Sequence, residues 1–259
     1  PAVPLPVPSD CIAAPCSLDA TVGHLLQDGA LDGRPAVLHF TAGNYTLNST
    51  YTIDGGALLS ELRLVGDGST VLAPLANETL FHIAAGAPPV LMQDLTLRGR
   101  IRVEGGTLRV VNCQFLEGAA LRVDGGSVQV HAARFAGVRA QDDESAIAIH
   151  AGELTVSDTT FEHNRARRGG AIFASGGALT VLRSVFRGNE AAADGGALAV
   201  DGNAAVLLAN GTSLEGNVAS AGGNAFSLTG GNASLTYGLP APLGSWVASG
   251  AICQEVPPP

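Results

Sequence analysis

Three consecutive carboxylates, Asp142, Asp143 and Glu144, directly precede the apolar run 146–149. Two carboxyl groups flanking a glycosidic bond can act as general acid and as base or nucleophile. Three carboxylates together can instead hold Ca²⁺, which prefers oxygen ligands. Asp142 and Asp143 are therefore the candidate catalytic residues of an enzyme that would act on a polysaccharide.

A structural interpretation of the same carboxylates competes with catalysis. Alignment of the repeats described below places Arg167 and Arg168 one repeat beyond Asp142 and Asp143. Opposite charges on neighbouring strands attract, so these residues are expected to form ion pairs at the surface. This interpretation is the simpler one, and we expect the chain not to be an enzyme.

The other polar residues suggest no metal site or cofactor. His39, His82 and His163 lack the spacing of metal ligands, and we expect neither a metal nor a cofactor. Arg102 and Arg122 occupy equivalent places in successive repeats, with Arg100 and Arg109 nearby, and such a group could contact an anionic polysaccharide. Acidic residues share this stretch, which favours a mixed, solvated face.

Composition narrows the classes of partner. The 259 residues carry a formal net charge of −9, with 14 basic residues, all Arg, against 23 acidic ones. A net acidic chain without a basic tail is a poor candidate for binding nucleic acid. No apolar run approaches the ~20 residues that cross a bilayer, so we expect no membrane insertion by this segment.

Sequons and cysteines favour a secreted or cell-surface glycoprotein with disulfides. Candidate glycosylation sites are Asn44, Asn48, Asn77, Asn210 and Asn232. The four cysteines, which allow three pairings, are Cys11, Cys16, Cys113 and Cys253. A Cys11–Cys16 bond would close a local loop. A Cys113–Cys253 bond would then require the C-terminal tail to fold back along the body.

A strand, a small-residue turn and a second strand recur between residues 100 and 235. The turns are Gly105-Gly106, Gly125-Gly126, Ala151-Gly152, Gly176-Gly177, Gly202-Asn203 and Gly230-Gly231. The turns recur every 20 to 28 residues. A period of this size is typical of a solenoid. The low aromatic content, 5%, and 34 glycines also suit a thin, stacked core.

Equivalent residues of the repeats form columns with a period of two, as in β-strands. The first inward column is Ile101, Leu121, Ile147, Ile172, Leu198 and Phe226. The outward column beside it is Arg102, Arg122, Ala148, Phe173, Ala199 and Ser227. After the turn, the inward pairs Leu108/Val110, Val128/Val130, Leu154/Val156 and Leu179/Val181 are followed by weaker ones at Ala205/Leu207 and Ala233/Leu235.

Two further columns predict ladders along the axis of the solenoid. An aromatic ladder contains Phe115, Phe135, Phe161 and Phe186, with Leu97 and Leu214 in the flanking repeats. Three residues further on, an amide ladder contains Asn164, Asn189 and Asn217. Like residues stack in this way only when parallel strands lie ~4.8 Å apart. The sequence therefore predicts an all-β, right-handed parallel β-helix.

We expect a single domain in five parts. These are a Pro-rich linker at 1–10, an N-terminal capping helix within 11–34, a β-helix at 35–235, an irregular C-terminal cap at 236–253 and a Pro-rich tail at 254–259. Ser17 is a good N-cap for the helix, expected over 18–27. Such covers protect the open end coils of a solenoid.

One motif resembles a known family. Phe161-Glu-His-Asn164 followed by Gly169-Gly-Ala-Ile172 is similar to the repeat of chlamydial polymorphic outer membrane proteins, and residues 135–230 carry further copies. This resemblance implies surface display with an adhesive or structural role. Residues 38–45 resemble the opening coils of pectin-lyase-like proteins. Asp142 and Asp143 resemble the paired aspartates of polygalacturonases, but the other sequence elements of those enzymes are absent.

The sequence thus predicts a non-catalytic structural or adhesive domain of a secreted or cell-surface glycoprotein. Its partner would be an extracellular protein or glycan, such as a Pro-rich glycoprotein matrix. Two alternatives remain open: a polysaccharide lyase or glycoside hydrolase acting on uronate polymers, and a glycan-binding module without catalysis.

Overall fold

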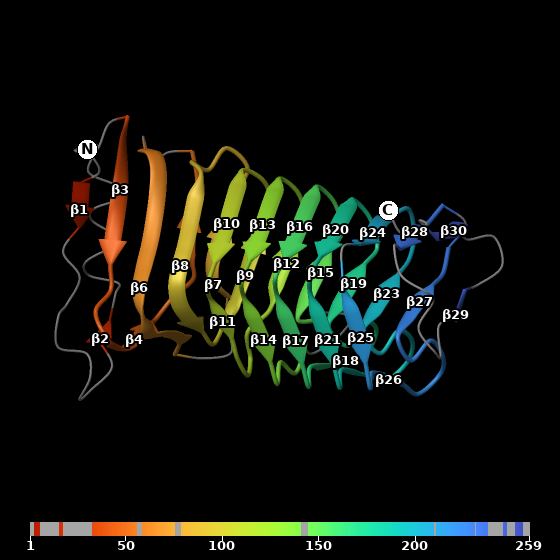
Figure 1. Ribbon diagram of the computed structural model, residues 1–259. Coiled ribbons are helices and arrows are strands. Elements are labelled where there is room, and N and C mark those ends of the chain that lie inside the picture. The colour runs from red at the N-terminus through yellow and green to blue at the C-terminus, as the bar shows by residue number, and fades with distance from the viewer. Residues whose placement is uncertain are drawn as a thin grey trace.

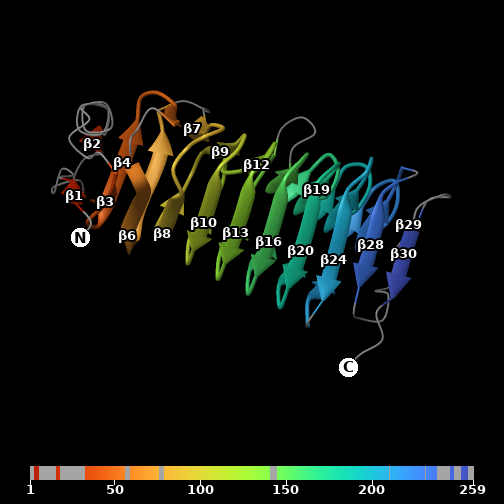
Figure 2. The ribbon, with the colours of Figure 1, turned by 90° about the horizontal axis from the view of Figure 1, so that it is seen from above.

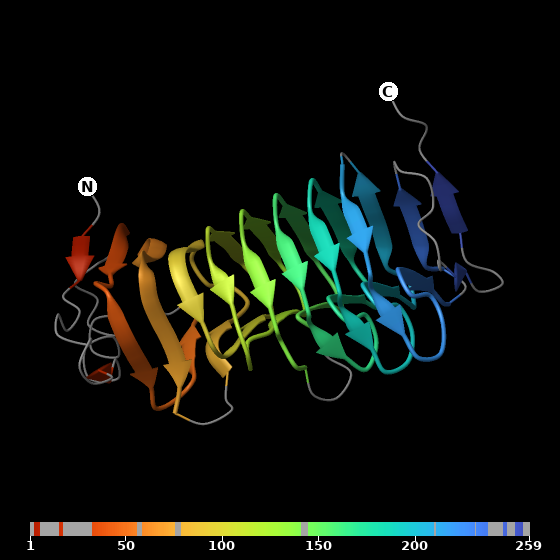
Figure 3. The same ribbon diagram turned by 60° about the horizontal axis from the view of Figure 1, so that its bottom comes forward.

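The computed structural model describes residues 3–5, 16–17, 33–55, 59–75, 79–140, 145–209, 211–230, 232–237, 246–247 and 252–255. Throughout these ranges the chain winds as a parallel β-solenoid, with successive coils stacked along one axis (Figures 1 and 3). The described residues contain no helix that could cross a membrane. The predicted right-handed parallel β-helix is confirmed.

Each regular coil passes through three rows of strands. Bounds in the first row are β1 Val3–Leu5, β3 Arg34–His39, β10 Thr107–Val111, β13 Ser127–His131, β16 Glu153–Ser157, β20 Ala178–Leu182, β24 Ala205–Ala209, β28 Ser234–Tyr237 and β30 Ile252–Glu255. Bounds in the second row are β2 Cys16–Ser17, β4 Gly43–Leu47, β11 Gln114–Phe115, β14 Arg134–Ala136, β17 Thr160–Glu162, β21 Val185–Arg187 and β25 Ser213–Glu215. Two long strands, β6 Leu59–Pro74 and β8 Val90–Leu97, pass through both rows and join them into one sheet.

The third row forms a separate sheet on another side of the solenoid (Figure 2). Its strands are β5 Tyr51–Ile53, β7 Thr79–Ile83, β9 Arg100–Val103, β12 Leu121–Val123, β15 Ile147–Ile149, β19 Ile172–Ala174, β23 Leu198–Val200, β27 Phe226–Leu228 and β29 Trp246–Val247. A small sheet lies at the corner between the second and third rows. Its strands, called the corner strands below, are β18 Arg165–Ala166, β22 Glu190–Ala191 and β26 Val218–Ala219.

The strand registers confirm the first inward column predicted from the sequence, which lies in the third row. Ile101 pairs with Leu121, Leu121 with Ile147, and the column continues in register to Phe226. All six side chains are buried, with exposures of 1% or less. Alternation of period two is therefore sufficient to align these coils, because every second side chain of a strand faces the core.

One part of the column alignment was wrong. In β24 the inward residues are Val206 and Leu208, not Ala205 and Leu207, and in β28 Leu235 pairs with Val206. The turn before β24 is one residue longer than the turn before β20. In this longer turn the Ala204 amide donates to the Asp201 carbonyl. A shift of one residue moves every side chain of a strand to the other face.

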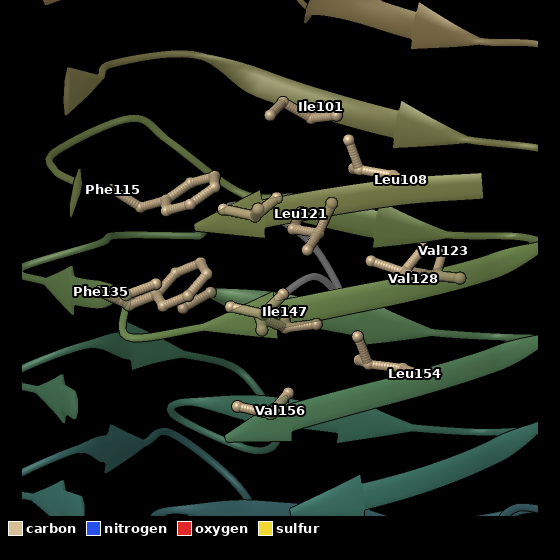
Figure 4. Close-up of a cluster of buried hydrophobic side chains, with 14 of the residues drawn as sticks. Ile101, Leu108, Phe115, Leu121, Val123, Val128, Phe135, Ile147, Leu154 and Val156 are labelled. Carbon is tan, nitrogen blue, oxygen red and sulfur yellow. The ribbon is translucent and has the colours of Figure 1, made fainter. Parts of the chain in front are cut away.

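The second row carries the aromatic ladder. Phe115, Phe135, Phe161 and Phe186 are fully buried and paired in register, and their ring centroids lie 4.2, 4.9 and 4.6 Å apart at interplanar angles of 9–13°. Figure 4 shows Phe115 and Phe135 stacked beside the aliphatic columns. Leu97 and Leu214 occupy the flanking rungs, as predicted. Each aromatic pair adds about 0.5–1.5 kcal/mol beyond the area it buries.

The two ends differ from what the sequence suggested. Val3–Leu5, in the expected linker, is a strand paired with β3, and β29 and β30 continue the third and first rows where an irregular cap was expected. The predicted capping helix lies outside the described residues.

Candidate functional site

The amide ladder holds the corner of the coils that follow the second row. Nδ2 of Asn164 donates to the Phe135 carbonyl at 3.0 Å and to Oδ1 of Asn189 at 2.9 Å, while Oδ1 of Asn164 accepts from the Val138 amide. Asn189 repeats this pattern with Phe161 and Asn217. All three Asn side chains are buried, and these bonds satisfy backbone groups that the turn would otherwise leave without partners. The predicted ladder is confirmed.

The Gly-Gly pair of the repeat allows backbone to pack directly against the third row. Gly195 has φ of +69°, and a Cβ there would lie 2.3 Å from the Leu198 carbonyl oxygen and 2.9 Å from the Ala199 nitrogen. A Cβ on Gly196 would lie 2.2 Å from the Asn224 carbonyl oxygen of the next coil. Only glycine fits such a turn, since any other residue would clash with backbone.

Within the described part of the chain, the outward face of the third row is buried in some coils and exposed in others. Ala148, Phe173 and Ala199 lie in the outward column but are 1%, 4% and 1% exposed. Arg102 and Arg122, in the same column, have 47% and 38% of their side chains exposed. The expected outward column is therefore solvated at β9 and β12 but buried from β15 to β27.

Three Arg side chains surround a pocket at the uncovered end. The pocket has a volume of about 280 Å³ and is lined by Thr79, Arg100, Ile101, Arg102, Ala120 and Arg122. These residues come from the starts of the neighbouring strands β7, β9 and β12 and from the residue before β12, and the three strands lie side by side in Figure 2. The structure thus brings together three of the four Arg residues grouped by the sequence, while Arg109 lies in the first row.

Two carboxylates hold the Arg side chains from the other end of the strands. Asp124 lies 3.0 Å from Nε of Arg102 and 2.9 Å from Nε of Arg122, and Glu104 lies 2.9 Å from Nη2 of Arg102. Partial burial alone would raise the pKa of Asp124, but hydrogen bonds and attraction from the two guanidinium groups outweigh it and lower the pKa below its ordinary value. The outward face at β9 and β12 is therefore an ordered network of charges.

One repeat of the chain is similar to a known family. Residues 158–175 match the Chlamydia polymorphic membrane protein (Chlamydia_PMP) repeat. The matched segment contains β17, Asn164, the Gly-Gly pair and β19, which are the parts that build the corner. No curated protein and no solved structure matches the chain.

A hydroxyl ladder, which was not predicted from the sequence, runs through the matched repeat and its neighbours. Oγ1 of Thr159 donates to the Ser157 carbonyl and accepts from the Ala133 amide, and Ser184 and Thr212 repeat this arrangement one and two coils further on. Each hydroxyl residue stands two residues before a rung of the aromatic ladder. That spacing is visible in the sequence and could have revealed the ladder.

Cys113 occupies the same column as a free, buried thiol. Its Sγ donates to the Val111 carbonyl at 3.4 Å, as the hydroxyls do in their coils. Burial is the main cause that raises its pKa to about 12. A thiol with so high a pKa is a poor nucleophile.

The Cys113–Cys253 pairing, one of those left open by the sequence, is not formed, since Cys113 is free. Starting from Leu108, in the coil of Cys113, the register passes through Val128, Leu154, Leu179, Val206 and Leu235 before it reaches Cys253. Those strand steps separate the two cysteines by about 29 Å, whereas a disulfide requires Cα atoms within ~7 Å. Cys16 lies in β2, and Cys11 is outside the described residues.

Polar side chains beside the small turns of the repeats form hydrogen bonds and ion pairs with one another. Nδ1 of His150 lies 2.7 Å from Oγ of Ser175. Arg168, expected opposite Asp143, forms an ion pair with Asp201 and places its guanidinium 4.6 Å from the Phe173 ring centroid. Burial alone would raise the pKa of Asp201, but hydrogen bonds from Arg168 and the Gly202 amide lower it overall.

The remaining site predictions fall partly beyond what the structure describes. Asp142 and Asp143 are outside the described residues, as are Asn77 and Asn210. Asn44, Asn48 and Asn232 are exposed at the surface, the position that N-glycosylation requires. Within the described ranges, no three His, Cys, Asp or Glu side chains gather as a metal ion would need.

Proposed function

We propose that this chain is a rigid structural or adhesive domain of a secreted or cell-surface glycoprotein and that it engages an extracellular protein or glycan without chemical turnover. The observation that carries the proposal is the role of the matched repeat. Its Phe, Asn and Gly residues are engaged in stacking, in backbone hydrogen bonds and in close packing. The motif therefore builds the scaffold itself.

The family name of the matched repeat supports a surface location, since it describes a membrane protein of Chlamydia. Three exposed sequons agree with passage through a secretory pathway. A β-helix is also suited to display, because its stacked coils hold side chains in straight, evenly spaced rows.

The proposal is tested by binding and turnover assays on the same purified chain. The chain would be immobilised and exposed to a panel of extracellular-matrix proteins and to a glycan array. In parallel, uronate polymers would be incubated with the chain and with an Asp142→Asn/Asp143→Asn variant. We expect a bound partner and no depolymerisation by either protein. Cleavage that the double substitution abolishes would overturn the proposal in favour of a polysaccharide-active enzyme.

A further inference from the structure

Among the described residues, the third row exposes its outer face at β9 and β12, and three Arg side chains line a pocket there. The equivalent face is buried from β15 onward, and Gly-Gly corners pack against it in the coils of β19, β23 and β27. The earlier coils turn from the second to the third row without a corner strand, in 98–99 and 116–120. The pocket therefore lies where the covering of the solenoid stops.

The charge at the pocket is built in register. Arg102 and Arg122 are paired neighbours on adjacent strands, so their Cα atoms are separated by about 4.8 Å. Arg100 starts the same strand as Arg102. The six described residues that line the pocket include these three Arg and neither Asp nor Glu.

The carboxylates orient these guanidinium groups without forming part of the lining. Asp124 and Glu104 stand at the far ends of their strands and engage Nε of both Arg102 and Arg122 and Nη2 of Arg102. Each guanidinium carries five N–H donors in a planar fork, and the carboxylates fix the orientation of that fork at Arg102 and Arg122. Side chains held in this way can bind an oxyanion with little further loss of conformational freedom.

The number of guanidinium groups favours an anion with three terminal oxygens. A carboxylate offers two oxygens and is matched by one Arg fork, whereas an ester sulfate offers three and can engage several forks together. The volume, about 280 Å³, is close to the lower limit of ~300 Å³ for small-ligand pockets. Such a pocket takes a group of the size of one sugar residue and not the surface of a folded partner.

We propose that the pocket formed by Arg100, Arg102 and Arg122 binds an ester sulfate carried by an extracellular glycan. The choice of a glycan rests on the proposed extracellular function. Recognition is by charge, since no aromatic ring lines the described part of the pocket.

The test is calorimetric titration of the intact chain with a heparin-derived tetrasaccharide and with its chemically desulfated form, which retains the carboxylates. We expect the sulfated form to bind about tenfold more tightly, and Arg102→Gln and Arg122→Gln each to weaken its binding about tenfold, as the loss of one charged hydrogen bond would. Arg109→Gln is the matched control, because it removes an exposed Arg from the first row and should leave binding unchanged. Arg102→Lys keeps the charge but not the fork and should give an intermediate loss.

Several outcomes would overturn this inference. Equal binding of the two saccharide forms, or no binding of the sulfated form, would show that sulfate is not recognised. Wild-type affinity in both Gln variants with unchanged thermal unfolding would show that these Arg residues do not bind it. Arg-dependent binding of a phosphopeptide in place of the saccharide would show that the ligand is not a glycan. None of these results decides the adhesive function, which the panel of matrix proteins and glycans tests separately. Cleavage of the tetrasaccharide, followed by mass spectrometry, would overturn the adhesive function, while Arg-dependent affinity in the same samples would still support the pocket.

Discussion

The coils on the two sides of β15 use the same third row in opposite ways. From β15 to β27 both faces of each strand are buried, and in the coils of β19, β23 and β27 a Gly-Gly turn packs against the strand. At β9 and β12 the outer face carries exposed Arg side chains and a pocket. The aromatic rungs are 20 residues apart at Phe115–Phe135 but 26 at Phe135–Phe161. The buried outer face thus begins in the first coil that has the longer spacing between aromatic rungs.

The largest expected effect is steric and belongs to the covered coils. Gly195→Ala places a methyl group against the Leu198 carbonyl at a positive φ, so unfolding free energy should fall by about 3–4 kcal/mol. Gly137→Ala is the matched control, since Gly137 has φ of +63° and a methyl group there would meet nothing within 4 Å. It should cost only about 1 kcal/mol. Equal losses in urea denaturation would show that the corner does not pack as described.

The amide ladder gives the next largest effect. Asn189→Ala removes bonds to Phe161 and Asn217 and leaves the Asn164 amide without its acceptor, so we expect a loss of about 3 kcal/mol. Gln129→Ala, which truncates an exposed side chain of β13, should change stability by less than about 0.5 kcal/mol. A similar midpoint for the two variants in urea would contradict a structural role for the ladder.

Acid should destabilise both regions through their ion pairs. The pKa values of Asp124 and Asp201 are lower in the folded chain than in the unfolded one, so their contribution is present above pH ~4 and is lost as the pH falls through the folded pKa values. Asp201→Asn should flatten the decline of Tm between pH 5 and 2, roughly the window in which carboxylates titrate. Glu117→Gln, at an exposed position, should leave the decline as it is. If the Tm of Asp201→Asn declined with pH as steeply as that of the wild type, the Arg168–Asp201 ion pair would not be a cause of the acid sensitivity.

Cys113 tests whether the hydroxyl ladder continues toward the open coils. Cys113→Ser should keep unfolding free energy within about 1 kcal/mol, because Ser184 already occupies this column. Cys113→Val should cost more than Cys113→Ser, since it removes the donor to Val111. If Ser were the worse substitution, the column would select for apolar character and not for a hydrogen bond.

The smallest effect concerns a strained turn. Ala132 is exposed and has φ of +53°, a conformation that Asn112 adopts at the equivalent place one coil earlier. Ala132→Asn should stabilise the chain by up to about 1 kcal/mol. Ala151→Asn, exposed and at an ordinary φ, should not. Thermal unfolding of the two variants distinguishes them.

The sequence was most informative where one side chain decides the contact. The Phe and Asn columns could be aligned because their residue types recur at matching places, and the structure confirms every rung. The alignment at Val206 was wrong by one residue because the length of the turn at Gly202 depends on a backbone hydrogen bond that residue types do not show. Burial of Ala199 could not be predicted either, since the covering segment is a different part of the chain whose path is set by glycine packing.

The pocket was only partly visible for the same reason. The pairing of Arg102 with Arg122 follows from the columns, but the uncovered space beside them depends on the absence of a corner strand in the described coils at β9 and β12. The charges over this stretch, taken by residue type alone, therefore suggested a mixed face. The structure resolves that face into two carboxylates at one end and an Arg-lined pocket at the other.

Thiol accessibility along the outward column tests the difference between the two regions most directly. Cysteine would be introduced as Ser227→Cys, a near-isosteric change at a buried position, and as Arg122→Cys at the open end, and alkylation of each would be followed by peptide mass mapping. We predict that the thiol of Arg122→Cys reacts rapidly in the native protein, while the thiol of Ser227→Cys and that of buried Cys113 react only on unfolding. Equal native reactivity at the two positions would contradict the covered face, and with it the account of how the repeat builds this scaffold.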